Sequence, residues 1–437
     1  MKKDLSLFFA LLFLLAALIT GCGSNAEAPP ASTPANLTFW TFVDQHKQFF
    51  DDAAAAWNKE HKDKPISLAS DVYPYDEMHS KLRLALQSGA GAPDIVDIEA
   101  SRYPIFLKGN ISLLPLNSIV EPEKDHLIMG RLENYASGGK YYGIDYHVGV
   151  TVAFYNKEIL GEAGVNPDDI KLWSDFEVAG RKVKAATGKP MMTIEVKNMW
   201  TFYPMISQQG SNYLDRDGNV IVDNEINIRT LEFLRDMIYR DGIAIPAPGG
   251  EHYTEEYYAF MSKGGAASVI MPLWFMGRFT DYMPELKGKM VIRPMPAWTA
   301  GGFRTAGMGG TGTSITNQCR NSELAKEFLA AAKLSKEGSL KTWTLLGFDP
   351  IRKDVYGMPE LNVDNKYTEF FGKDIIDVVK SVKDDINPVN LGPLYPDATT
   401  LVNRTTLFKV LCEQSQTPEE GLKAAAAELR AEKQTIK

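Results

Sequence analysis

A regular alternation of strand-like and helix-like segments is the feature that most constrains the fold of this chain. Residues 37–42 (LTFWTF) are rich in β-forming side chains and predict a strand, and residues 66–73 and 93–98 predict two more. Between these strands, apolar side chains recur at helical spacing over residues 49–57 and 78–86. Strands that alternate with helices in this way predict an α/β fold with mostly parallel sheets.

The alternation continues towards the C-terminus. Residues 142–156 predict one long strand with a glycine inside it, and residues 266–271 and 292–296 predict further strands. Helices are expected near residues 157–163, 174–187, 200–209, 225–240, 323–333, 335–346, 375–383, 398–413 and 418–432.

Two short segments resemble ligand-binding loops but are better explained otherwise. The glycine-rich residues 307–313 (GMGGTGT) lack the lysine that follows the last glycine of a phosphate-binding loop, so we interpret them as a flexible connection. Residues 215–219 (DRDGN) resemble the start of a calcium loop. The glutamate at the last position of such a loop is missing, so these residues predict a hairpin turn instead.

Length and composition indicate a globular protein of two lobes. The 437 residues exceed what one ordinary hydrophobic core holds, and the chain is 44% hydrophobic and 23% charged. The net charge is −8, and no basic run is long enough to hold a nucleic acid, so we expect no nucleic-acid partner. The sequence contains no cofactor motif and no cysteine pair with metal-ligand spacing, so we expect neither a cofactor nor a metal.

The first 22 residues predict a secreted protein that is held at the membrane by lipid. Lys2 and Lys3 precede an almost unbroken apolar run that ends in small residues and Cys22. This order is typical of a secretory signal, and the apolar run is too short for a membrane span. The cysteine after small residues resembles a bacterial lipobox, so we expect residues 1–21 to be removed and Cys22 to be lipidated. An ordinary signal peptide with an incidental cysteine is the alternative.

Residues 22–36 are small, polar and proline-rich, and we expect them to form a tether. The predicted location is therefore the extracellular face of the cell membrane, with the chain anchored by lipid. The two other cysteines, Cys319 and Cys412, are expected to be free thiols, because a chain of this size needs no disulfide.

Several segments together resemble the extracellular sugar-binding lipoproteins of ABC importers, in the maltose-binding-protein class. They are the lipobox, the tether, PDIVDIE at 93–99, YYGIDYHVGVTVAFYNKEIL at 141–160 and SELAKEFL at 322–329. Four further segments resemble a narrower group, the binding proteins for arabinose and arabino-oligosaccharides. They are MISQQG at 205–210, EEYYAFM at 255–261, GGAASVIMPLWFMGRF at 264–279 and LGFDPIR at 346–352.

The resemblance implies a two-lobe fold of the type II periplasmic-binding-protein kind, with a ligand cleft between the lobes. Three chain crossings are expected near residues 146–150, 309–313 and 347–352. One lobe would comprise residues 37–147 and 312–349, and the other would comprise residues 148–311 and 350–437. The implied ligand is an arabino-oligosaccharide, the implied partners are ABC permease subunits, and the protein is expected to be a monomer.

Binding a sugar requires flat aromatic surfaces for its C–H face and polar groups for its hydroxyls. Trp200 and Trp274 stand at strand-to-helix junctions, where maltose-binding proteins place stacking aromatics, so the resemblance implies that both contact ligand. For Trp40, a position in the core and a position in the cleft are both open. The remaining tryptophans are expected in the core (Trp57, Trp173 and Trp343) or are left open (Trp298).

The other candidate ligand contacts stand beside predicted strand ends and crossings: Asp44, His46, Glu99, Arg102, Asp145, His147, Asn198, Gly310, Phe348 and Asp349. Glu99 and Arg102 follow the third strand at its carboxyl end, where open α/β sheets bind ligands. Asp44 has a second interpretation as a helix cap, and His147 has one as a buried core histidine. Asp94 and Asp97, inside the strand motif, are expected to be structural.

The chain departs from the maltose group in two places. The segment YGIDYHV is longer than its counterpart, and Ser101 stands where that group has a cleft acid after the third strand. Both departures argue against a malto-oligosaccharide ligand.

Two other function classes remain open. A cell-surface glycoside hydrolase would need two carboxyl groups about 5–10 Å apart, for which Glu99 and Asp145 are the available pair. A sugar-presenting partner of a sensor would share the fold, so the sequence does not exclude that role. Without a nucleophile elbow or a metalloprotease motif in the chain, a binding protein is the leading interpretation.

Overall fold

The computed structural model describes residues 33–387 and 389–435. The predicted signal peptide, Cys22 and most of the predicted tether lie outside the described residues. The strands are β1 Ala35–Thr41, β2 Ile66–Val72, β3 Ile95–Glu99, β4 Ala136–Ser137, β5 Lys140–Tyr141, β6 Thr151–Asn156, β7 Met192–Ile194, β8 Ala244–Pro246, β9 Ser268–Pro272, β10 Met290–Pro294 and β11 Thr311–Ile315.

The α-helices are α1 Asp44–Glu60, α2 Tyr75–Ser88, α3 Tyr103–Phe106, α4 Asn117–Val120, α5 Met129–Leu132, α6 Lys157–Glu162, α7 Trp173–Thr187, α8 Phe202–Ser207, α9 Glu225–Tyr239, α10 Glu255–Ser262, α11 Met276–Tyr282, α12 Ser322–Leu329, α13 Lys336–Leu346, α14 Lys366–Phe371, α15 Ile375–Val382, α16 Tyr395–Thr400, α17 Leu407–Leu411 and α18 Pro418–Thr435. Two π-helical stretches, Ala330–Leu334 and Leu401–Thr406, interrupt the long helices predicted near residues 323–333 and 398–413.

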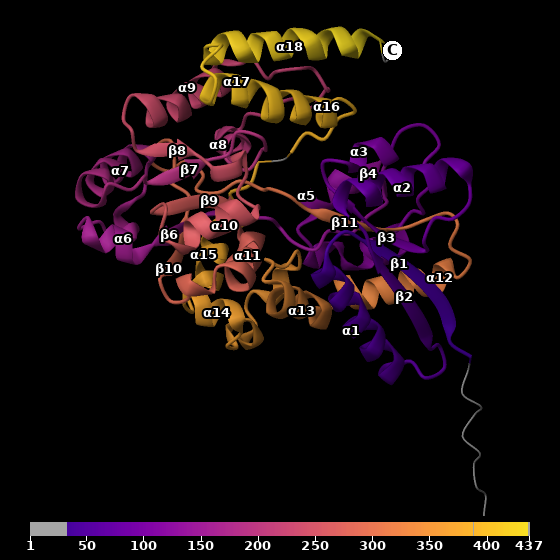
Figure 1. Ribbon diagram of the computed structural model, residues 1–437. Coiled ribbons are helices and arrows are strands. Elements are labelled where there is room, and N and C mark those ends of the chain that lie inside the picture. The colour runs from indigo at the N-terminus through magenta and orange to yellow at the C-terminus, as the bar shows by residue number, and fades with distance from the viewer. Residues whose placement is uncertain (1–32, 388, 436–437) are drawn as a thin grey trace, which may run out of the picture.

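Two sheets form the centres of two lobes, which lie side by side in Figure 1. The first lobe contains the sheet β11-β3-β1-β2, in which β1 runs parallel to β2 and β3. The second lobe contains the sheet β10-β6-β9-β7-β8. These two sheets confirm the predicted two-lobe α/β fold.

The expectation of mostly parallel sheets is only partly right. In the first lobe β11 is antiparallel to β3, and in the second lobe β6 is antiparallel to both β9 and β10. The strands β6 and β11 directly follow segments that pass between the lobes. The chain therefore enters these two strands from the other lobe. It does not pass through a crossover helix of the same lobe, which is the connection that parallel neighbours need.

Helices cover both faces of each sheet, because successive strand residues point to opposite sides. In the first lobe Phe39 packs with α1 residues, whereas its neighbour Trp40 packs with α2 residues. In the second lobe Tyr155 joins the core beside α7 and α9, and Phe154 joins the core beside α11 and α14. All six residues of β6 are therefore buried, because helices cover both faces of this strand.

Three connecting segments lie side by side between the sheets. Ile144 pairs with Thr313, His147 with Pro350, and Val150 with Gly307, each as an isolated antiparallel bridge. The long strand predicted at 142–156 is wrong over its first half, where these single bridges replace a continuous ladder. Gly149 adopts a φ of +78°, and a side chain there would collide with the carbonyl oxygen of Met308 on the neighbouring segment.

Several smaller expectations can be compared with the fold. The segment around Asp215 is a turn: the Asp215 carboxylate accepts N–H bonds from Asp217 (3.0 Å) and Asn219 (2.7 Å), and Leu214 bridges Val220. Cys319 and Cys412 are free. Nowhere in residues 33–387 and 389–435 does a helix combine the length and the apolar character needed to span a membrane.

Candidate functional site

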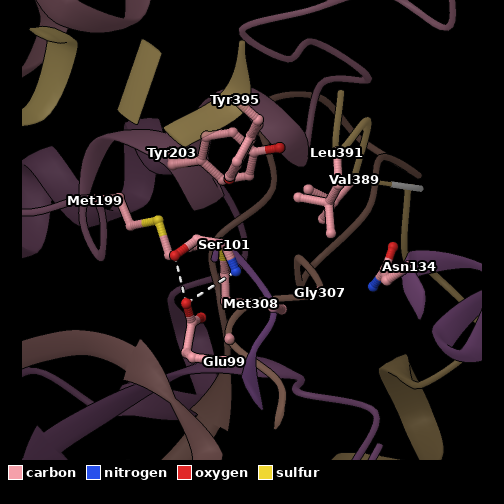
Figure 2. Close-up of a pocket in the computed structure, with 12 residues that line it drawn as sticks. Glu99, Ser101, Asn134, Met199, Tyr203, Gly307, Met308, Val389, Leu391 and Tyr395 are labelled. Carbon is pink, nitrogen blue, oxygen red and sulfur yellow. Dashed lines mark hydrogen bonds between the residues drawn. The ribbon is translucent and has the colours of Figure 1, made fainter. Parts of the chain in front are cut away.

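A small hollow lies between the lobes at the carboxyl end of β3 (Figure 2). We call it the inter-lobe hollow. Its lining comes from the first lobe, the second lobe, the connecting segments, and the start of α16 with the chain before it: Glu99, Ala100, Ser101, Asn134, Met199, Tyr203, Gly307, Met308, Gly309, Val389, Leu391 and Tyr395. The sequence analysis predicts ligand binding at this end of the strand, because open α/β sheets bind ligands at the carboxyl ends of their strands.

Glu99 is the acidic residue of this lining. Its Oε2 accepts hydrogen bonds from the backbone N–H of Ser101 (2.9 Å), from the Ser101 hydroxyl, and from the Tyr75 hydroxyl (3.1 Å). Its Oε1 is shielded from solvent and has no hydrogen-bond partner among residues 33–387 and 389–435. Burial raises the pKa of Glu99, although the Ser101 and Tyr75 hydrogen bonds and Arg102 oppose the rise. The Oε1 atom is therefore a buried acceptor without a donor, and buried polar atoms are usually paired.

Two tryptophans adjoin the hollow at Gly309. Trp200 lies between β7 and α8, and Trp274 lies between β9 and α11, as predicted. A Cβ atom added to Gly309 would be 3.2 Å from Trp274 Nε1 and 3.5 Å from the Trp200 ring. Both indoles are half-buried. These rings offer apolar surface at the edge of the hollow.

Tyr203, Tyr395, Met199 and Asn134 line the hollow but were not among the predicted contacts. The rings of Tyr203 and Tyr395 are perpendicular, with centroids 6.1 Å apart. Tyr203 belongs to the segment NMWTFYP, which already drew attention through Trp200. Tyr395 is far along the chain, and no local pattern marks it as a neighbour of Glu99.

His46 lies in the first-lobe interior and not in the hollow lining. Its Nδ1 is 2.9 Å from Asp97 Oδ2, and its ring stacks on Tyr146 at a centroid distance of 4.1 Å. Burial lowers the pKa of His46, against the opposing effect of Asp97. Asp97 also accepts hydrogen bonds from the hydroxyls of Thr41 and Thr313. This agrees with the structural role expected for Asp97.

Asp145 and Gly310 meet in a second buried cluster. Asp145 Oδ2 accepts bonds from Arg131 Nη2 (2.8 Å) and the Tyr135 hydroxyl (2.7 Å), and its Oδ1 accepts one from the Thr311 N–H (3.1 Å). Burial by itself would raise the pKa of Asp145, but Arg131 and its other neighbours hold that pKa below the ordinary value. Asp145 is therefore an ion-paired group beneath the second connecting segment.

His147, Phe348 and Asp349 meet where two connecting segments pair. His147 Nδ1 is 3.6 Å from Asp349 Oδ1, and within the described part of the chain neither atom has a hydrogen-bond partner. The other Asp349 oxygen accepts the Val150 N–H at 3.0 Å. Phe348 packs against the His147 ring at a centroid distance of 4.7 Å. These three side chains are buried at the connection between the lobes, outside the hollow lining.

The remaining candidates are dispersed. Trp40 is buried against Tyr73 in the first lobe, and Asp44 is exposed in the first turn of α1, whose N-cap is Val43 without a side-chain cap bond. Arg102 Nη2 donates to Asp76 at 2.8 Å, and Asn198 donates to the Tyr253 hydroxyl. Trp57, Trp173 and Trp343 are buried in the cores as expected, and Trp298 is half-buried, with its Nε1 bonded to the Met205 carbonyl oxygen at 3.0 Å.

The groups around the hollow are of the kinds that suit a neutral, hydroxyl-rich ligand. They combine one buried carboxyl acceptor, aromatic rings and backbone from a glycine-containing segment, and the described residues of the lining include no lysine or arginine. For the hydrolase interpretation the candidate partner of Glu99 was Asp145, but that carboxylate is enclosed by Arg131, Tyr135 and Thr311.

Sequence comparison relates this chain to known binding proteins. The model of the bacterial extracellular solute-binding protein family matches residues 44–338. The arabinooligosaccharide-binding protein of Bacillus subtilis (strain 168) is 50% identical over 433 residues, which cover 98% of this chain and 100% of that protein. The protein of the same name from Halalkalibacterium halodurans is 48% identical over 398 residues, which cover 91% of this chain and 89% of the relative.

Solved structures share the fold at lower identity. The GacH receptor of Streptomyces glaucescens, solved unliganded and with acarbose, aligns with a TM-score of 0.74 and 22% identity over 92% of this chain and 98% of that chain. The maltose-bound MalE3 of T. maritima aligns with a TM-score of 0.73 and 19% identity over 91% of this chain and 99% of that chain. The matched family model and the two close relatives together show that this chain belongs to the bacterial extracellular solute-binding proteins.

Proposed function

We propose that this protein captures arabino-oligosaccharides outside the cell in the inter-lobe hollow and delivers them to the permease of an ABC transporter. The observation that carries the proposal is the unpaired, buried Oε1 of Glu99 in a hollow lined by both lobes and adjoined by Trp200 and Trp274. A carboxyl oxygen would accept a bond from a sugar hydroxyl, and the indole faces would cover the C–H face of the ring.

The choice of sugar is supported by the two relatives named arabinooligosaccharide-binding proteins, at 50% and 48% identity. Half-identical binding proteins can differ in ligand, because a few contacts decide specificity. The proposal therefore needs a direct comparison among sugars.

Calorimetric titration of the purified protein with arabinose, arabinotriose, xylotriose and maltotriose tests the ligand. Micromolar or tighter binding of arabinotriose, with much weaker binding of the other trisaccharides, supports the proposal. Tight binding of xylotriose or maltotriose would keep a sugar-binding function and reject arabinan. Binding of no sugar in the panel would reject the proposed ligand class and favour a different solute. Loss of arabino-oligosaccharide uptake in a deletion strain would distinguish transport from the presentation of sugar to a sensor.

We further propose that the protein is a binding protein without catalytic activity. The family and its named relatives are binding proteins. Glu99 is the acidic member of the hollow lining, whereas glycoside hydrolysis uses two carboxyl groups. Release of reducing ends from arabinan by the purified protein would contradict this part of the proposal.

The anchor and the division into lobes complete the proposal. Lipidated Cys22 would hold a monomer on the extracellular face of the membrane, and residues 22–36 would serve as its tether. The lobes would comprise residues 37–147 plus 312–349 and residues 148–311 plus 350–437. The Cys22→Ala variant should appear in the culture medium, while retention on the membrane would reject the lipid anchor. Size-exclusion chromatography with light scattering tests the monomer.

A further inference from the structure

We propose that Glu195 is a positioning residue for the sugar site: its buried carboxyl group holds the backbone of Trp200 in place without itself lining the hollow. The inference rests on the proposed function, in which Trp200 contacts the sugar. It concerns how that contact is maintained.

The carboxyl group of Glu195 joins two loops of the second lobe. Glu195 directly follows β7 and is fully buried. Its Oε2 accepts the Trp200 N–H at 3.0 Å, and its Oε1 accepts the His252 N–H at 2.8 Å. Its own N–H donates to the Thr201 hydroxyl at 3.1 Å, so both ends of the residue hold the loop that carries Trp200.

Further contacts fasten the same two loops together. Val196 N–H donates to the Gly250 carbonyl oxygen at 3.1 Å, and Asn198 donates to the Tyr253 hydroxyl. The indole of Trp200 then lies against Trp274 and the Gly309 edge of the hollow. A displacement of the Trp200 backbone would therefore move a ring at the edge of the site while leaving the sheet behind it unchanged.

The backbone N–H groups of Trp200 and His252 each donate to a different oxygen of Glu195, so both carboxyl oxygens must act as acceptors. An ionised carboxylate supplies them, whereas a protonated carboxyl has one O–H that cannot accept in the same way. The Glu195–His252 loop junction therefore depends on the charge of Glu195. Buried donors that lose their acceptor are costly, and this favours the ionised form for the loop arrangement seen here.

The surroundings of Glu195 contain little to compensate that charge. Among the ion pairs of residues 33–387 and 389–435, its basic partner is His252, with Nδ1 3.7 Å from Oε1. Burial lowers the pKa of His252 to about 3, so this imidazole is neutral. Burial raises the pKa of Glu195 to about 8; the His252 and Trp200 N–H bonds oppose the rise and the Glu251 carboxylate adds to it.

The other titratable side chains described near the Glu195 carboxyl group are two tyrosines and one lysine. Burial raises the pKa of Tyr253 and of Tyr257 on α10, which keeps both phenols neutral. Lys197 Nζ donates to the Gly249 carbonyl oxygen at 3.0 Å on the exposed side of the loop. Sugar affinity should therefore rise as the pH increases through about 8, where the folded protein gains the ionised form of Glu195.

The test compares Glu195→Gln with Thr193→Val. Glutamine keeps the shape of Glu195 but replaces one accepting oxygen with an NH₂ donor, so it can satisfy only one of the two N–H groups. Thr193, on the same strand, contacts His252 Nε2 (2.9 Å) and the Tyr257 hydroxyl (3.0 Å), but its side chain has no hydrogen bond to the Trp200 loop. Thr193→Val thus controls for general destabilisation of this buried region.

Arabinotriose affinity is measured by calorimetry from pH 6.5 to pH 9, with thermal unfolding and backbone amide exchange at Trp200 and His252. We expect wild-type affinity to increase with pH, and Glu195→Gln to bind about tenfold more weakly at pH 9 without this increase. Amide exchange at Trp200 or His252 should accelerate in Glu195→Gln. Thr193→Val should keep the wild-type affinity and pH profile even if it unfolds at a lower temperature.

Wild-type affinity, pH profile and amide exchange in Glu195→Gln would overturn the positioning role. An equal loss of affinity in Thr193→Val at an equal loss of stability would overturn it as well. A wild-type protein that binds none of the sugars would instead overturn the proposed function and, with it, the sugar-related role of Glu195. Hydrogen exchange needs no ligand, so it still determines whether the carboxyl group holds the loop.

Discussion

The indole rings of Trp200 and Trp274 meet edge to face, with centroids 5.2 Å apart and planes at 78°. They come from two different strand-to-helix junctions of the second lobe, separated by more than seventy positions in the sequence. Their common neighbour is Gly309, on a segment that connects the lobes and lines the inter-lobe hollow. The two indole rings of the second lobe therefore pack against a segment that connects the two lobes.

The Trp200→Ala substitution should weaken sugar binding by about 1–3 kcal/mol, because it removes a half-buried aromatic surface beside the hollow. Calorimetric titration with arabinotriose measures this loss. The matched control is Trp298→Ala, since Trp298 is also half-buried but packs against Trp173 and Phe233. The control should lose stability and retain affinity. Unchanged affinity in Trp200→Ala would place this residue in the core.

The Glu99→Gln substitution should flatten part of the dependence of stability on pH. Burial raises the folded-state pKa of Glu99 above its unfolded value, so its stabilising contribution is present below the unfolded pKa and is lost as the pH rises through the folded pKa. Thermal unfolding from pH 4 upwards measures the effect. The difference between wild type and variant should change in favour of the variant as the pH rises. A constant difference across the range would show that Glu99 has an ordinary pKa.

The Asp145→Asn substitution should destabilise the fold by about 3–5 kcal/mol, because it leaves Arg131 as a buried charge without its partner. The control is Asp168→Asn, in which the exposed pair with Arg293 is broken at a cost of about 0–1 kcal/mol. Chemical denaturation gives both values. Equal small losses would mean that the Arg131 pair is not the stabilising feature assigned to it.

The same pair has a defined pH dependence. Burial would raise the pKa of Asp145, but Arg131, His147, Tyr135 and Lys333 together outweigh this and lower the pKa below the unfolded value. Its contribution is therefore present above the unfolded pKa and is lost as the pH falls through the folded pKa. Asp145→Asn should accordingly differ most from wild type at neutral pH and least in acid.

The Gly310→Ala substitution should cost about 2–5 kcal/mol of stability, because an alanine would adopt an unfavourable φ and collide with its neighbours. Gly310 has a φ of +127°, and an added Cβ would lie 2.6 Å from the Tyr135 hydroxyl and 2.7 Å from Asp145 Oδ2. Gly301→Ala separates the two effects, since Gly301 has a φ of +75° and open space around it. If both variants lose the same stability, the crowding around Gly310 has no measurable consequence.

Local sequence patterns were sufficient for much of the fold. Period-two and helical spacings located β1, α1, β2 and α2, because each pattern reflects which side of a short element is buried. The same logic failed for residues 142–150, which have strand-like composition but form only single bridges to residues of the other two connecting segments. Those partners are distant in the sequence, and no local period encodes them.

The sequence by itself determined the alternating α/β architecture, the core tryptophans and the position of Glu99 at the carboxyl end of a buried strand. Only the tertiary structure decided which polar residues face the hollow. It enclosed His46 and Asp145 in buried networks, and it brought Tyr203 and Tyr395 together from different parts of the chain. The physical reason is that burial and hydrogen bonding of a polar group depend on long-range neighbours, whereas strands and helices follow from short-range spacing.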